Sequence, residues 1–176
     1  MKYFVFATAL TLPLGLAAGA MAAGNGNGSA PSKPKCEQGL VYDKKTKTCV
    51  IAKESNLDVD TLYDTVQALA YAGRYDDAQT VLAAMPQDDD RPLTYIGFTN
   101  RKMGNIDTAM AFYTRAIETN PANVLARSYM GQGLVEMGQI TAAMDELKAI
   151  RAHGGTGSWA EASLAKAIAT GQTFNY

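Results

Sequence analysis

Histidine is nearly absent from this chain of 176 residues, which has His153 alone. Most acid–base and metal arrangements in proteins need at least two histidines or a comparable set of ligands. The sequence also has no glycine-rich phosphate loop and no serine in the context of a nucleophile elbow. These absences exclude the common catalytic constellations. We therefore expect no enzymatic activity, no cofactor and no bound metal.

Long apolar runs are scarce as well, and the one that stands out lies at the start of the chain. Residues 1–22 carry a single charge at Lys2, an apolar run from Phe4 to Leu16, and then mostly small residues ending in Ala20-Met21-Ala22. The run is shorter than the ~20 residues of a membrane span, and Pro13 interrupts it. The pattern is typical of a secretory signal peptide. It predicts a periplasmic or secreted protein with no membrane span after cleavage.

Residues 23–35 contain Gly, Asn, Ser, Pro and Lys, and no apolar side chain larger than alanine. Such a composition cannot bury enough surface to offset the entropy of an ordered chain. This stretch is therefore predicted to be a flexible linker.

The only two cysteines, Cys36 and Cys49, bracket a short segment. In an exported protein such a pair predicts a disulfide. Strand-forming residues on both sides of a polar turn indicate a β-hairpin, so residues 36–55 form a disulfide hairpin segment. The segment is similar to the cysteine-bounded hairpin of small modules that recognise chitin, which carry further cysteines. That resemblance implies an alternative function, carbohydrate binding in the cell envelope.

The stretch from Arg91 to Pro121 contains two amphipathic helical patterns separated by a glycine turn. A spacing of 34 residues separates Gly97 from Gly131, Gly104 from Gly138, and Ala109 from Ala143. In the second helix of this stretch, Ala109, Tyr113, Ala116 and Pro121 follow one another as small residue, aromatic residue, small residue and terminal proline. In this order the segment resembles the tetratricopeptide repeat, a helix-turn-helix unit of 34 residues. The residues predicted to pack the repeats are Gly97, Ala109, Tyr113, Ala116, Pro121, Gly131 and Ala143.

The resemblance implies an all-α fold. We expect a right-handed superhelical stack of about three such repeats over residues 56–176, preceded by the hairpin. An earlier, shorter copy covers residues 59–85, because Gly73 precedes Gly104 by only 31 residues. Residues 158–170 begin with the spacing of a capping box and are predicted to form a C-terminal capping helix.

In stacked helical pairs the first helix of each pair lines a concave face, so helical phase predicts which side chains project there. Arg101 among them is expected to be exposed and structurally neutral. Aromatic, amide and arginine side chains are typical of a protein-binding surface. The predicted partner-binding residues are Tyr63, Gln67, Tyr71, Thr94, Phe98, Arg101, Ser128, Gln132 and Val135. The competing interpretation is that Tyr63 and Phe98 pack on a neighbouring helix.

The sequence thus favours an exported adaptor that binds a protein or peptide through this helical groove. The lysines, arginines and asparagines with which chaperone-binding members of the family hold a carboxylate are not present as a set. Nucleic acid is a poor candidate, because residues 56–176 carry nine basic and fourteen acidic residues. The alternatives are the carbohydrate binder described above and an enzyme with an unrecognised site.

Overall fold

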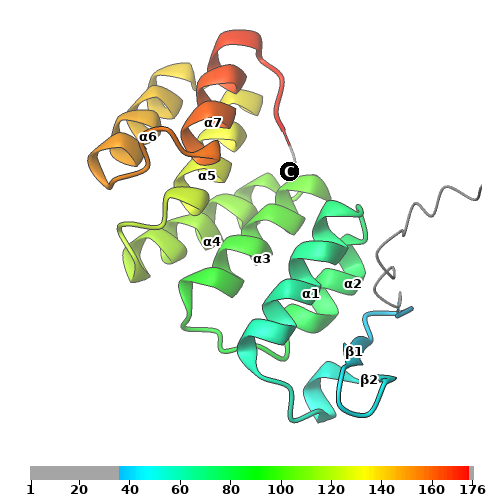
Figure 1. Cartoon of the computed structure of the whole chain (residues 1–176). Helices are drawn as coiled ribbons and strands as arrows, with labels where there is room; N and C mark the ends of the chain where they lie inside the picture. The colour runs from blue at the N-terminus through cyan, green and yellow to red at the C-terminus, as the bar shows by residue number, and fades with distance from the viewer. Residues whose placement is uncertain (1–35, 175–176) are drawn as a thin grey trace, which may run out of the picture. The chain divides into compact units, whose positions relative to one another are not determined.

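The structure is a computed structural model that describes residues 36–174 (Figure 1). The predicted signal peptide, residues 1–22, and the whole of the predicted linker, residues 23–35, lie outside the described residues. The described elements confirm a helical domain preceded by a small antiparallel hairpin. Their bounds are β1 Val41–Asp43, β2 Thr48–Val50, a 3-10 turn at Ala52–Glu54, α1 Val59–Tyr71, α2 Tyr75–Leu82, α3 Asp90–Lys102, α4 Ile106–Thr119, α5 Val124–Glu136, α6 Ile140–Ala152 and α7 Trp159–Thr170.

A glycine closes the first helix of each of the three pairs. Gly73, Gly104 and Gly138 have φ angles of 74°, 86° and 72°, a left-handed conformation that other residues adopt only with strain. After each glycine a backbone N–H returns to a carbonyl five residues earlier, as from Asn105 to Asn100 at 2.9 Å. This is the hydrogen bond of a Schellman motif, and it ends the helix and reverses the chain. The regular glycine spacing therefore sets the regular helix pairs.

Gly97 lets the helices of the second pair approach closely. A Cβ atom at this position would lie 2.6 Å from the ring of Tyr113 and 3.2 Å from the carbonyl oxygen of Ala109, both on α4. Gly131 occupies the equivalent place in the third pair, but the atoms nearest to a Cβ there belong to Leu164 of α7. Glycines at the same repeat position thus make different contacts: Gly97 contacts the second helix of its own pair, and Gly131 contacts the last helix.

Helix α7 closes the C-terminal end of the stack. Its N-cap is Ser158, whose hydroxyl accepts the backbone N–H of Glu161, while the Glu161 carboxylate accepts the N–H of Gly157 at 2.7 Å. The first bond satisfies one free donor of the first turn, as the capping-box spacing predicted, and the second holds the residue that precedes the N-cap. Leu164 is fully buried against α5. The helix ends at Gly171, again with positive φ.

The hairpin packs against α2 of the helical domain. Val41, paired with Val50 in the sheet, is fully buried in the same core as α1 and α2. Arg74, at the start of α2, donates to the carbonyl oxygen of Cys36 at 2.9 Å. A disulfide joins Cys36 to Cys49, and closing a loop with a separation of 13 residues stabilises by roughly 3 kcal/mol in the chain-entropy model. Within residues 36–174, no helix combines the length and apolar character needed to cross a membrane.

Candidate functional site

The first helices of the pairs, together with α7, form a continuous layer, which we call the first-helix face. Helix α1 contacts α3, α3 contacts α5, and α5 contacts α7 (Figure 1). All nine residues predicted to bind a partner belong to α1, α3 and α5. The sequence thus identified the helices of this layer, and the burial of each side chain decides which of these residues a partner can reach.

Six of the nine predicted binding residues are buried, so the expectation that they line an open groove is wrong at these positions. Their exposed fractions are 1% for Thr94, 0% for Phe98, 3% for Arg101, 0% for Ser128, 0% for Gln132 and 7% for Val135. Helix α3 is packed by α1, α2, α4 and α5, and its residues 92–99 are all buried. Tyr63, Gln67 and Tyr71 of α1 are partly exposed, because α1 begins the stack.

Phe98 is a packing residue at the centre of an aromatic cluster. Its ring lies 4.7 Å from that of Tyr129 on α5 and makes an edge contact with Tyr71 on α1 at 6.4 Å. Such tilted and edge-on pairs are the favoured geometries of aromatic rings. The cluster runs from the first pair to the capping helix, and its members are Tyr63, Tyr71, Tyr75, Tyr95, Phe98, Tyr113, Tyr129 and Trp159.

Partly exposed aromatic side chains sit on the edge of this buried cluster. Tyr63, Tyr71 and Trp159 each keep some exposure, while ring contacts tie Tyr63 and Tyr71 to Tyr95 and tie Trp159 to Tyr129. Tyr71 also shares a hydroxyl–hydroxyl hydrogen bond with Tyr95. Burial raises the pKa of both Tyr63 and Tyr95 well above the ordinary value, so these phenols stay neutral at all physiological pH values. The face therefore presents fixed rings with neutral hydroxyl groups.

A row of polar side chains follows the same face along α5. Ser128, Gln132 and Glu136 are spaced by four residues and so lie on one side of the helix. The Ser128 hydroxyl is 3.0 Å from that of Ser163 on α7. The Glu136 carboxylate accepts a hydrogen bond from Arg101 of α3 at 2.6 Å. The row therefore joins three helices across the layer.

Arg101 was predicted to be exposed and structurally neutral, and this prediction is wrong. Its side chain is fully buried, and its ion pair with Glu136, whose side chain is 31% exposed, links the second pair to the third. The two other guanidinium nitrogens, Nε and Nη2, make no hydrogen bond with the described residues. Sequence reasoning missed Glu136, since no pattern within one repeat indicates a contact between two repeats.

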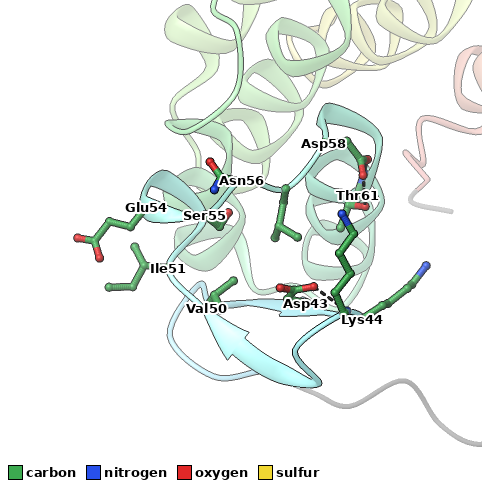
Figure 2. Close-up of a pocket in the computed structure, with 11 residues that line it drawn as sticks. Asp43, Lys44, Val50, Ile51, Glu54, Ser55, Asn56, Asp58 and Thr61 are labelled. Carbon is green, nitrogen blue, oxygen red and sulfur yellow. Dashed lines mark hydrogen bonds between the residues drawn. The ribbon is translucent and has the colours of Figure 1, made fainter.

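A second candidate site is an open pocket of about 680 Å³ between the hairpin and the start of α1 (Figure 2). Two of its three carboxylates, those of Asp43 and Asp58, already have structural partners. Asp43 accepts the backbone N–H of Lys45 at 2.7 Å, and Asp58 caps α1 by accepting the N–H of Thr61 at 2.7 Å. In each case the backbone N–H is the main cause of a lowered carboxyl pKa. The eleven lining residues include no aromatic ring on which a sugar would stack.

The fold and the first-helix face define a helical-repeat scaffold. The family model described as tetratricopeptide repeat matches residues 101–168, so this segment is similar to that family. The fold is also that of a type III secretion chaperone from Yersinia enterocolitica, SycD, solved in complex with a peptide of the translocator YopD. The two share 19% identity and a TM-score of 0.52, over 66% of this chain and 92% of that chain.

Two further solved structures are similar. PcrH from Pseudomonas aeruginosa shares 21% identity with a TM-score of 0.49, over 65% of this chain and 90% of that chain. PcrH in complex with the chaperone binding region of PopB shares 21% identity with a TM-score of 0.49, over 65% of this chain and 96% of that chain. A comparison with curated proteins gave no match.

Proposed function

We propose that this protein is an exported, non-catalytic scaffold that binds an extended peptide or protein segment on its first-helix face. The observation that carries the proposal is the row of partly exposed aromatic side chains, Tyr63, Tyr71 and Trp159, held on a fully buried aromatic cluster. Rings fixed in this way lose little conformational entropy on binding, and aromatic side chains commonly dominate interface energy.

Two further observations support a peptide as the partner. The fold is shared with SycD, which was solved in complex with a peptide of the translocator YopD. The face also offers amide and hydroxyl groups, such as Gln67 beside Tyr63 and Tyr71, that can bond to a peptide backbone. Export is proposed from the sequence of residues 1–22, which has the pattern of a signal peptide.

The test is a selection of binding peptides from a random display library, followed by affinity measurements on variants. We expect Tyr71→Ala to weaken the best peptide about thirtyfold, because truncating an aromatic anchor commonly costs about 2 kcal/mol. The matched control is Phe112→Ala, which removes a partly exposed ring from α4, outside the first-helix face. Circular dichroism must show equal helicity for the two variants.

The expected affinity for Phe112→Ala is that of the unaltered protein. Equal loss in both variants would indicate a general effect of destabilisation and would contradict the assignment of the face. Failure to select any peptide, with the protein folded, would count against a peptide partner.

A further inference from the structure

The last described residues of the chain lie on the first-helix face. After α7 ends at Gly171, the chain runs back from the capping helix (Figure 1). Residues 172–174, which we call the tail, have no helical structure. They contact Gln132 and Glu136 of α5, two members of the polar row described above. The tail therefore covers part of the surface that the proposed function assigns to a partner.

The tail is held by bonds of the kind that a peptide ligand makes. The backbone N–H of Phe174 donates to the side-chain oxygen of Gln132 at 2.7 Å. The hydroxyl of Thr173 donates to the Glu136 carboxylate at 2.6 Å, which also accepts from Arg101. Gln132 is fully buried, although helical phase places it on the binding face. A side-chain amide that accepts a main-chain N–H recognises an extended chain whatever its sequence.

Side-chain contacts at the tail add sequence preference. The ring of Phe174 packs against the core cluster formed by α5, α6 and α7 and is partly buried. The ammonium nitrogen of Lys166 lies 4.6 Å from the centroid of this ring, within the range of a cation–π contact. Gln172, in contrast, is exposed. The first-helix face thus recognises a hydroxyl side chain, as in Thr173, followed directly by an aromatic side chain, as in Phe174.

A tail of this kind can leave the face at low cost to the fold. It lies outside the helix pairs, and α7 is capped and packed independently of it through Ser158 and Leu164. Segments with few buried contacts open at much lower free energy than the core of a domain. When the tail leaves, the buried Gln132 amide loses its bond to the Phe174 N–H and needs a new partner, and the Glu136 carboxylate, which keeps its bond from Arg101, can accept a hydroxyl from another chain.

We propose that the tail is an internal ligand, which a partner peptide of the same chemistry must displace. This inference rests on the proposed function, and it names the partner class as an extended peptide with a serine or threonine followed by an aromatic residue. Because the tail is attached to the domain, its effective concentration at the face is on the order of millimolar. Occupancy by the tail thus lowers the affinity of the free protein for its partner.

The experiment uses a labelled synthetic peptide with the sequence of residues 170–176 and measures its binding by fluorescence anisotropy. The proteins compared are the full chain, a chain that ends at Gly171, the full chain with Thr173→Ala and Phe174→Ala together, and the control Gln172→Ala. We expect the first two altered chains to bind the peptide at least about tenfold more tightly than the full chain. Gln172→Ala should match the full chain, because this side chain is exposed.

The double substitution leaves the chain length unchanged, so it gives the same comparison if the shortened chain folds poorly. Equal binding by all four proteins, or no binding by any, overturns the inference. A lower melting temperature of the altered chains without tighter binding assigns the tail a purely structural role and also overturns it. The peptides selected from the library separate the two proposals: if they still depend on Tyr71, the proposed function stands without the internal ligand.

Discussion

Gly97→Ala is expected to destabilise the protein by about 1–3 kcal/mol, although alanine is the better helix former by roughly 0.5–1 kcal/mol. The added methyl group would lie 2.6 Å from the ring of Tyr113, which is fully buried, and 3.2 Å from the backbone oxygen of Ala109. Neither group can move without separating α3 from α4. Thermal and urea unfolding, followed by circular dichroism, measure the effect.

The matched control is Gly133→Ala, in the middle of α5. A Cβ atom there would lie 3.3 Å from two side-chain atoms, Cδ of Arg101 and Sδ of Met110. We expect a change of less than about 1 kcal/mol, since a displacement of only a few tenths of an ångström relieves these contacts, against the much closer 2.6 Å at Gly97. If Gly97→Ala were as stable as this control, the close approach of α3 and α4 at Gly97 would be contradicted.

Arg101→Ala is expected to lower the free energy of unfolding by about 2–3 kcal/mol. Breaking a buried ion pair commonly costs 3–5 kcal/mol, and the 31% exposure of the Glu136 side chain reduces that figure because water can solvate the carboxylate left behind. Arg101→Met should cost less, because it keeps the apolar volume and removes the two nitrogens that lack hydrogen-bond partners among the described residues.

Urea unfolding of both variants, alone and combined with Glu136→Gln, gives the coupling energy between the two side chains. An unchanged unfolding midpoint for Arg101→Ala would mean that the side chain is exposed after all. In that case the original expectation of a neutral surface arginine would be restored.

Much of the fold was predictable because it depends on local signals. The turn glycines need left-handed backbone, the small residues recur with the repeat, and the box at Ser158 and Glu161 caps the last helix. The shorter α2, with 8 residues against 14 in α4, follows from the closer spacing of Gly73 and Gly104. Each of these features depends on residues within one repeat or one helical turn, so the local sequence is enough to predict it.

The candidate site was less predictable, because burial depends on what packs from elsewhere. Helical phase placed Phe98 and Gln132 on the correct helix layer. It did not indicate that the aromatic cluster would bury Phe98 or that the tail would bind Gln132. The Arg101–Glu136 pair joins two repeats, so its partners share no local pattern. Gly131 shows the same limit, since its nearest neighbour is Leu164 of α7 and its equivalent Gly97 faces α4.

The most direct test of a peptide-binding first-helix face is nuclear magnetic resonance of the isotope-labelled chain, titrated with a peptide selected from the display library. The account predicts that amide shifts change along α1, α3 and α5, at α7, and in the tail at Thr173 and Phe174. Residues at the hairpin pocket should keep their shifts. Changes confined to that pocket, from Asp43 to Thr61, with none on α3, α5 or the tail, would contradict the account.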